Sequence, residues 1–299
     1  MSTKTIRIGS RGSDLALWQA RHVKQQLESL GAEVSITIIK TQGDRIQDIG
    51  FDKMEGKGFF TKEIEAALLA GEIDLAVHSH KDLETESPAG LLIAAVSERE
   101  DPRDVLLIHS SAVDGSQDYQ LKSGARIGTS SARRKSLVAR FFPEGVIVDL
   151  RGNVPTRVEK VRSGEYDAIL LAKAGLDRLG LDLSDLTVVP LDPEEFVPAP
   201  AQGVLALQTR SDDHSTIEAV EKLNHKDVQS RIAVERRVLN LMQGGCQLPL
   251  GVHCPEEGRV FVSFSNDWSE GADLYEFEGE HGEELAEIIV ETLNEPEEE

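Results

Sequence analysis

Short apolar runs alternate with amphipathic segments in the N-terminal third of the chain. The runs at 6–11, 34–39 and 74–79 predict strands. Between them, apolar residues recur at helical spacing, with Asp14 as the expected helix cap and Leu30 as part of the apolar face. Strands that alternate with helices in this order predict a parallel-rich sheet with helices on both faces.

The same alternation starts again after the charged, proline-containing segment 98–103, which we expect to connect two domains. Further strands are predicted at 105–108, 126–129, 146–150 and 167–171. Helices are predicted to start at Ser130–Ser131 and near Pro155. The proline-rich segment 190–200 is expected to return the chain to the first domain, where 204–208 adds a strand.

The C-terminal part of the chain has a different pattern. Helical spacing covers 215–240, alternating residues predict antiparallel strands at 259–265 and 273–278, and a last helix covers 283–293. These elements predict a small α+β domain. The expected boundaries are 1–99 plus about 201–220 for domain 1, 100–200 for domain 2 and 221–299 for domain 3.

Charge narrows the classes of partner. The 299 residues include 53 acidic and 32 basic side chains, which give a formal net charge of −21 at pH 7. This excess argues against nucleic acids and anionic membranes as partners. No apolar run approaches the roughly 20 residues of a transmembrane helix, and the N-terminus lacks a signal-peptide core, so we expect a cytoplasmic protein. Such an acidic surface also suits a cytoplasm of high salt, because dissolved ions screen the repulsion among surface carboxylates.

The segment 244–251 places a cysteine among turn-forming residues. Cys246 follows two glycines and precedes Pro249 and Gly251, so the segment is expected to be an exposed loop. A tight turn in which the cysteine is only a small filler explains this octapeptide equally well. The chain has only one other cysteine, Cys254, so its cysteines do not make a disulfide scaffold, and no other soft ligands complete a zinc site.

Six of the basic residues lie at or just beyond the predicted carboxyl ends of strands. They are Arg11, Lys81, Arg133, Arg134, Arg151 and Arg157. Ligands of open α/β sheets bind at these strand ends. A surface ion pair is the simpler explanation for any single arginine, but so many cations in so acidic a chain indicate a ligand with several negative charges.

The segment 128–134 combines a helix N-terminus, hydroxyl side chains and two arginines, and it predicts an anion site. Carboxylates fit as well as phosphates, because the sequence has neither a Walker loop nor a dinucleotide-binding glycine motif. His78 and His80 share one face of a predicted strand, as metal ligands would. Lys81 beside them and the lack of a further ligand cluster argue against a metal.

Taken together, these motifs resemble the porphobilinogen deaminase, or hydroxymethylbilane synthase, family. The segments that carry the resemblance are Gly9–Ser13, Leu15–Ala20, Gly56–Phe60, His78–Asp82, Glu98–Asp104, Gly128–Arg134, Leu150–Arg157, Ala199–Gly203 and Gly245–Gln247. They run along nearly the whole chain. The resemblance implies three domains, the first two like type II periplasmic binding proteins with an active cleft between them. Domain 1 would be the catalytic lobe, domain 2 the cofactor-binding lobe, and domain 3 would carry the cofactor cysteine.

The resemblance also implies a transferase of tetrapyrrole and haem biosynthesis. It would join four porphobilinogen molecules head to tail, with loss of ammonia, on a dipyrromethane cofactor covalently attached at Cys246, and then release hydroxymethylbilane by hydrolysis. Asp82 would be the catalytic carboxylate. The residues implied on the cofactor side are Lys81, Thr129, Ser130, Ser131, Arg133 and Arg134. Those implied on the substrate side are Arg11, Ser13, Gln19, Arg151 and Arg157. The protein is expected to act as a monomer without a metal.

The segment 42–58, rich in glycine, aspartate and lysine, is expected to be a mobile lid in which Lys53 and Lys57 face the anionic pyrroles. The chain departs from the family pattern next to Asp82. A proline usually follows the Lys-Asp pair closely, whereas here it comes only at Pro88. The turn after Asp82 is therefore expected to have a different shape.

Two other functions remain open from the sequence. A two-lobed binding protein for a small polyanion would use the arginines but would leave Cys246 and Asp82 without a role. A cysteine-dependent acyltransferase would need a histidine to activate Cys246, and His253 is near it in sequence. The mass of the purified chain separates these functions, because two added pyrrole units are expected only for the deaminase.

Overall fold

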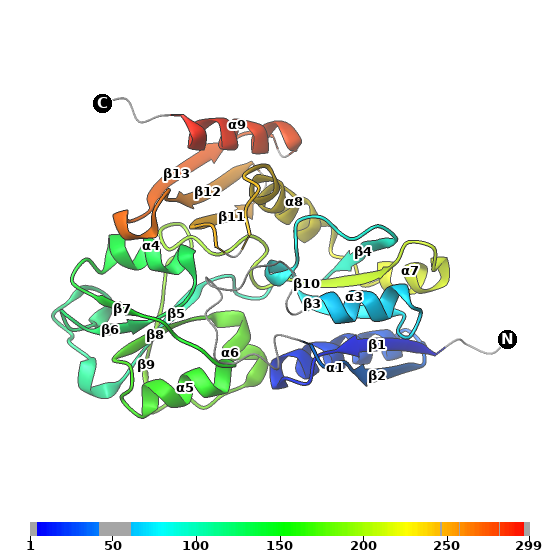
Figure 1. Ribbon diagram of the computed structural model, residues 1–299, viewed down its shortest axis with the longest axis horizontal. Helices are drawn as coiled ribbons and strands as arrows, with labels where there is room; N and C mark the ends of the chain where they lie inside the picture. The colour runs from blue at the N-terminus through cyan, green and yellow to red at the C-terminus, as the bar shows by residue number, and fades with distance from the viewer. Residues whose placement is uncertain (1–4, 42–60, 246, 257, 281, 296–299) are drawn as a thin grey trace. The chain divides into compact units, whose positions relative to one another are not determined.

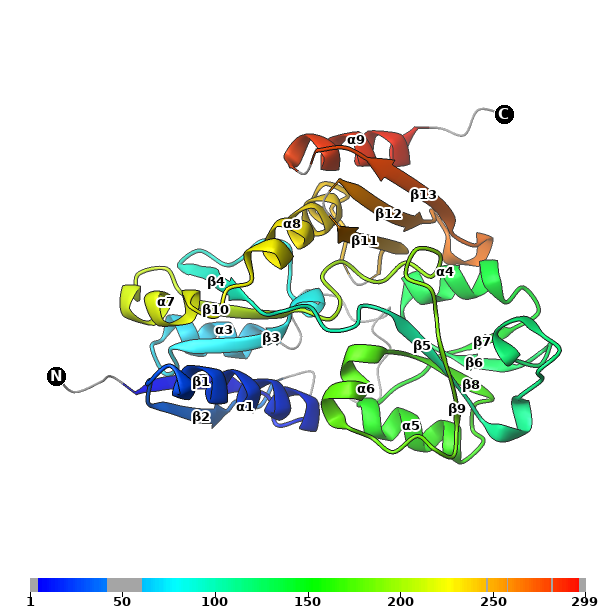
Figure 2. The same cartoon turned by 180° about the vertical axis from the view of Figure 1, so that it is seen from behind.

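The computed structural model of the chain describes residues 5–41, 61–245, 247–256, 258–280 and 282–295. Contacts between residues divide the chain into two compact units. Unit 1 comprises Met1–Glu100 and Gly203–Ser230, and unit 2 comprises Asp101–Gln202 and Arg231–Glu299. Figures 1 and 2 show the helices and strands of each unit with their labels.

Unit 1 contains a five-stranded sheet in the order β2-β1-β3-β10-β4. Its strands are β1 (Ile6–Ser10), β2 (Val34–Ile38), β3 (Leu75–Ser79), β4 (Leu91–Val96) and β10 (Leu205–Arg210). β1 pairs in parallel with β2 and β3, whereas β10 is antiparallel to β3 and β4. The predicted return of the chain to the first sheet is therefore confirmed.

Helices cover both faces of this sheet. They are α1 (Asp14–Ser29), α3 (Lys62–Leu69) and α7 (His214–Glu221). α1 and α7 share a core with Val77 of β3, whereas α3 packs in a separate core with the preceding residue, Ala76. Because successive strand residues point to opposite faces, these cores lie on opposite sides of the sheet. This arrangement confirms the prediction of helices on both faces.

The first helix differs from the sequence prediction in two details. Ser13, not Asp14, is the N-cap, because Ser13 has an extended backbone and its side chain accepts a hydrogen bond from Ala16 N. Asp14 is already the first helical residue. Leu30 is 52% exposed, because the helix ends at Ser29 and Leu30 only caps it.

Unit 2 contains a second five-stranded sheet, in the order β7-β6-β8-β5-β9. Its strands are β5 (Asp104–Ile108), β6 (Arg126–Gly128), β7 (Val146–Val148), β8 (Ala168–Ala172) and β9 (Thr187–Pro190). β6 is parallel to β7 and β8, whereas β5 is antiparallel to β8 and β9. The two large sheets thus each combine a parallel trio with antiparallel strands.

The second sheet is also covered on both faces. The helices are α4 (Ala132–Phe141), α5 (Val154–Arg162) and α6 (Lys173–Leu179). Leu137 of α4 packs in one core with Leu170 of β8, and Val158 of α5 packs in another with the neighbouring Ile169. The expected α/β architecture is therefore confirmed in both large sheets.

The C-terminal elements form a small α+β domain, as predicted, and from Arg231 onward they belong to unit 2. They are α8 (Lys226–Leu241), β11 (Leu250–Glu256), β12 (Arg259–Phe264), β13 (Asp273–Glu278) and α9 (Glu283–Asn294). The strands form an antiparallel sheet in the order β11-β12-β13. Val238 of α8, Val262 of β12 and Ile289 of α9 meet in its core.

Close backbone contacts attach this small domain to the rest of unit 2. Val252 N donates a hydrogen bond to Pro198 O at 3.1 Å. At Gly251 a Cβ atom would lie 2.6 Å from Val197 O, so only glycine fits there without a shift. Arg140 Nη1 of α4 donates to Ala272 O at 3.0 Å. The sheet that follows the cysteine loop is therefore fixed against segment 197–198 and α4.

In the part of the chain that the structure describes, no helix combines the length and apolarity needed to cross a membrane.

Candidate active site

Lys81 and Asp82 lie just beyond the carboxyl end of β3, after His80. They belong to a short 3-10 turn, His80–Asp82, which is fixed by a hydrogen bond from His80 N to Val204 O at 2.9 Å. The Asp82 side chain is exposed and Lys81 is partly buried, so a ligand can reach the carboxylate. The two residues therefore lie at a strand end, as the sequence indicated, and their chemical roles stay predictions.

Arg11, Ser13 and Gln19 follow the neighbouring strand β1. β1 and β3 pair in parallel, with Gly9 opposite Ala76, so both strands end at the same edge of the sheet. Ser13 caps α1, and Arg11 is partly buried. Gln19 is buried, and its Nε2 donates to Ser79 Oγ at 2.8 Å. Gln19 thus holds the last residue of β3, just before the turn that carries Asp82.

In unit 2, three hydroxyl side chains order the loop between β6 and α4. Ser131 caps α4 and accepts a hydrogen bond from Arg134 N at 3.5 Å. Ser130 Oγ donates to Leu150 O and accepts from Leu150 N, both at 3.0 Å. Thr129 Oγ1 accepts from Ser131 N at 3.3 Å. The loop is therefore held rigidly next to the residue that precedes Arg151.

Arg133 and Arg134 point into the interior of unit 2, where both meet Asp104. Arg133 Nη2 lies 2.8 Å from Asp104 Oδ2, and Arg134 Nη2 lies 2.7 Å from Asp104 Oδ1. The exposed fractions of the arginine side chains are 5% and 8%, and that of Asp104 is 0%. Sequence reasoning missed Asp104. Its signal was an acidic residue placed immediately before the apolar run of a strand.

Arg151 and Arg157 follow β7, which pairs in parallel with β6. The segments 129–134 and 151–157 therefore leave the sheet at adjacent strand ends. Asn153 caps α5 by accepting from Thr156 N at 3.0 Å, and Gly152 has a φ of 111°, which favours glycine. Arg157 Nε donates to Gly152 O at 2.7 Å, and both arginines are partly buried.

The predicted cofactor cysteine, Cys246, and the predicted lid residues, Lys53 and Lys57, lie outside the described residues. Cys254 is fully buried in β11, and its thiol donates to Glu256 O at 3.0 Å. His253, the base that an acyltransferase would need, is also buried. Cys254 is therefore part of the core of the small domain.

A family model described as "Porphobilinogen deaminase, dipyromethane cofactor binding domain" matches residues 6–218. The chain belongs to the porphobilinogen deaminase family. The porphobilinogen deaminase of Trichlorobacter lovleyi is 47% identical over 255 residues, which cover 85% of this chain and 80% of that protein. The porphobilinogen deaminase of Nitratiruptor sp. is 42% identical over 299 residues, which cover 95% of this chain and 93% of that protein.

In this member of the porphobilinogen deaminase family, the match includes Asp82 and every predicted site residue that the structure describes. Both large sheets contribute to the matched segment. Cys246 lies beyond its end. The family match therefore covers the turns and arginines at the strand ends but does not extend to Cys246, so the attachment of a cofactor at Cys246 stays a proposal.

His78, a candidate metal ligand by sequence, is buried in the sheet of unit 1. Its Nε2 lies 3.2 Å from Gln208 Oε1. Burial disfavours the imidazolium and lowers the pKa of His78 to about 4, so the ring is neutral at pH 7. Across the described ranges, no cluster of three or more His, Cys, Asp or Glu side chains is arranged to hold a metal ion.

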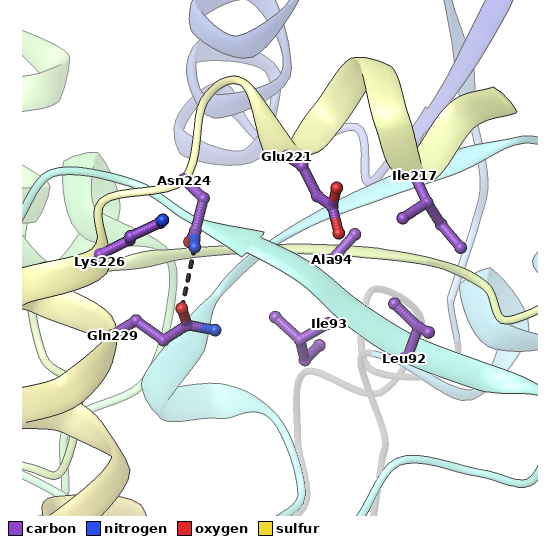
Figure 3. A pocket seen from close by; sticks show the side chains of 8 residues that line it. All are labelled: Leu92, Ile93, Ala94, Ile217, Glu221, Asn224, Lys226 and Gln229. Atoms are coloured by element: carbon purple, nitrogen blue, oxygen red, sulfur yellow. Dashed lines mark hydrogen bonds between the residues drawn. The ribbon is translucent and has the colours of Figure 1, made fainter. Parts of the chain in front are cut away.

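A cavity of about 590 Å³ in unit 1 lies away from the predicted site residues of this deaminase-family chain. Its wall is formed by β4, α7 and the start of α8, as Figure 3 shows. Asn224 Nδ2 donates to Gln229 Oε1 at 2.8 Å in this wall. Among the described residues that line it, Lys226 is the only cation, beside apolar residues such as Leu92 and Ile217. It therefore lacks the arginines that a polycarboxylate would need.

Proposed function

We propose that this protein is a hydroxymethylbilane synthase. It joins four porphobilinogen molecules head to tail with loss of ammonia and then releases hydroxymethylbilane by hydrolysis. The observation that carries this proposal is the family match over residues 6–218, which includes the exposed carboxylate of Asp82 and the arginines at the strand ends.

The residues of unit 2 fit a cofactor that carries carboxylates. Arg133 and Arg134 together bring two positive charges to one buried carboxylate, and Arg133 Nε is buried without a hydrogen-bond partner among the described atoms. An anionic group satisfies both the excess charge and such a donor. We assign Lys81, Thr129, Ser130, Ser131, Arg133 and Arg134 to the cofactor. When bound at Cys246, the dipyrromethane supplies the pyrrole terminus that porphobilinogen units extend.

Asp82 would stabilise the positive charge that develops on the substrate. Loss of ammonia from the aminomethyl group of porphobilinogen leaves a cation that is shared between the methylene carbon and the pyrrole nitrogen. A carboxylate near that nitrogen stabilises the cation and accepts a proton when the ring becomes neutral again. The exposure of Asp82 at the end of β3 supports this role, because the substrate can reach it.

Porphobilinogen carries acetate and propionate groups, and the remaining cationic residues suit them. We assign Arg11, Ser13, Arg151 and Arg157 to these carboxylates, since guanidinium groups bind carboxylates in a bidentate manner. Gln19 would act indirectly, because its Nε2 holds Ser79 at the end of β3. If segment 42–58 acts as a lid, Lys53 and Lys57 would add further positive charge.

The net charge of −21 supports a protein that acts on a small molecule in the cytoplasm. We propose that it works as a monomer and has neither nucleic acid nor a membrane as a partner. Size-exclusion chromatography with light scattering tests the monomer, since a stable dimer would elute at twice the mass of 32.8 kDa.

Replacing Asp82 tests the proposed function. Asp82→Asn keeps the shape of the side chain and removes its charge, so we expect kcat to fall by roughly a hundredfold or more, on the order of 3 kcal/mol. The cofactor mass should remain, because the arginines are unchanged. Glu84→Gln, which removes another exposed carboxylate from the same loop, is the matched control. Turnover of Asp82→Asn within a few-fold of the wild type would show that the carboxylate is structural.

Intact mass spectrometry separates the synthase from a polyanion-binding protein. The wild-type chain should carry the mass of two pyrrole units, and Cys246→Ser should remove that mass together with activity. An unmodified wild-type chain that binds porphobilinogen without turnover would contradict the synthase. Loss of the added mass in Cys254→Ser but not in Cys246→Ser would contradict the assigned attachment site.

A further inference from the structure

Asp104 is a fully buried carboxylate at the first position of β5 that receives hydrogen bonds from three side chains. Arg133 Nη2 donates to Oδ2 at 2.8 Å, and Arg134 donates to both oxygens, from Nε at 3.2 Å and from Nη2 at 2.7 Å. Gln202 Nε2 donates to Oδ1 at 2.9 Å. Both carboxylate oxygens are therefore saturated by side chains that come from α4 and from the end of segment 190–202.

Each of the two guanidinium groups is also held from a second side. Arg133 Nη1 donates to Val197 O at 2.8 Å, and Arg134 Nη1 donates to Leu170 O at 3.1 Å. A planar guanidinium with acceptors on two sides can neither rotate nor shift. Asp104 is the acceptor that the two groups share, so it fixes one relative to the other.

The charges in this cluster do not balance. Two guanidinium groups face one carboxylate in a region with almost no solvent, and burial lowers the pKa of Arg133. Such an excess of buried positive charge is costly unless an anion approaches. The cluster is therefore built for a negatively charged group and is not neutral without it.

Val197, which accepts from Arg133, also touches the small domain. Gly251 packs against Val197 O, and Val252 N donates to the adjacent Pro198 O. Gly251 follows the predicted cofactor cysteine by only a few residues in the sequence. The orientation of Arg133 is thus coupled, through one backbone segment, to the strand that follows the cysteine loop.

We propose that Asp104 is a positioning residue for cofactor loading, which fixes the guanidinium groups of Arg133 and Arg134 in the orientation that receives the carboxylates of the dipyrromethane. This inference rests on the proposed function. It distinguishes two roles for Asp104, namely holding the guanidinium groups in place and reducing their positive charge. If Asp104 only moderated the positive charge, its removal would strengthen anion binding, whereas a positioning role requires that its removal weakens loading.

The chain supplies a matched control in unit 1. Asp74 is also 0% exposed and also pairs with two arginines, since Arg7 Nε lies 2.8 Å from Oδ2 and Arg210 Nη2 lies 3.2 Å from Oδ1. It precedes β3, so it stands at the opposite end of that strand from Asp82. Asp74→Asn therefore removes a comparable buried carboxylate and leaves the predicted cofactor residues untouched.

The test compares Asp104→Asn and Asp74→Asn by thermal unfolding and by intact mass. Both variants should melt below the wild type. Only Asp104→Asn should lose cofactor, with a loaded fraction lower by roughly tenfold, the loss expected when one charge-assisted contact to a carboxylate is misplaced. In the loaded fraction of Asp104→Asn, kcat should fall while KM for porphobilinogen changes little, because that substrate is assigned to Arg11, Arg151 and Arg157.

Loading of Asp104→Asn equal to that of Asp74→Asn, or above that of the wild type, would overturn the proposal. If Asp104→Asn does not fold, Gln202→Leu takes its place, since it keeps all three charges and removes one of the two donors to Oδ1, together with the hydrogen bond from Gln202 Nε2 to Pro102 O. Gln202→Leu should load less than the wild type, and equal loading would overturn the proposal as well. A wild-type chain without added pyrrole mass would instead contradict the proposed function, so the two failures are distinguishable.

Discussion

Glu235 of α8 provides the sharpest stability prediction, because a single buried carboxylate holds two segments of unit 2. Its side chain is 0% exposed. Oε2 accepts a hydrogen bond from Ala201 N at 2.7 Å, and Oε1 accepts one from Cys254 N at 2.8 Å. Glu235→Gln preserves the volume but replaces one acceptor oxygen by an NH₂ group, which cannot accept from a backbone N–H.

The expected cost follows from this geometry. One of the two buried N–H groups loses its acceptor and faces another donor, and leaving a buried donor unsatisfied costs about 1–3 kcal/mol. The other bond loses its charge assistance, which is worth about 1 kcal/mol. We therefore expect Glu235→Gln to lower the free energy of unfolding by about 3 kcal/mol. Ala201 has a φ of 60°, so Ala201→Gly should recover about 1 kcal/mol by removing backbone strain.

Urea unfolding followed by circular dichroism measures these changes. Glu287→Gln, an exposed position on α9, is the control and should change the free energy of unfolding by less than about 0.5 kcal/mol. A loss below about 1 kcal/mol for Glu235→Gln would refute the reasoning, because it would mean that both backbone N–H groups find other acceptors.

Three further predictions concern pH, the second cysteine and salt. The folded-state pKa of His78, about 4, lies below its unfolded value of 6.5, so the unfolded chain binds more protons and stability falls as pH drops from 7 to 4. The loss attributable to His78 should reach about 3 kcal/mol, measured as the difference in urea unfolding between the wild type and His78→Gln. Cys254→Ser should cost about 1–3 kcal/mol and leave the added cofactor mass in place, and unchanged stability would contradict its burial in the core. Finally, with a net charge of −21, the melting temperature should rise between low salt and about 1 M KCl, where the Debye length is about 3 Å, and a flat or falling melting temperature would contradict this.

Much of the fold could be predicted because hydrophobic periodicity is a local property. The strands β1 and β3 were predicted to within about a residue, whereas β10 begins one residue later and ends two residues later than predicted. Among the strands that the structure describes, three were missed, each for a physical reason. β4 is a continuous apolar run, which fits a buried helix equally well, and β9 is short and ends in proline at the edge of its sheet. β11 contains Gly251, whose presence reflects contact with Val197 and hides the strand pattern.

Only those features of the candidate site that depend on neighbouring residues in the sequence could be predicted. Arg11, Lys81 and Arg151 lie just beyond strand ends because a basic residue follows each of these strands within a few positions of the sequence. The helix cap Ser131 was also found, because a serine before a helical segment is a local signal. Which way a side chain turns after that point depends on partners that the local sequence does not contain.

Arg133 and Arg134 show where that limit falls. From sequence they count as two cations at a helix N-terminus, free for an anion. In the structure Asp104, 29 and 30 positions earlier in the chain, occupies one side of each guanidinium. Asp104 neutralises part of the positive charge of the two arginines, so a ligand interacts with the remaining charge and not with the charge of both guanidinium groups.

Asp74 and Arg7 repeat the arrangement across 67 positions. In both units the carboxylate stands at the start of a strand, beside a run of apolar residues that leaves it no water. A desolvated carboxylate there must be paired, so an acidic residue at the head of a buried strand is a usable signal that distant arginines converge on it. A count of cations at strand ends therefore overestimates the positive charge of an anion site, because acidic residues at the starts of strands neutralise part of it.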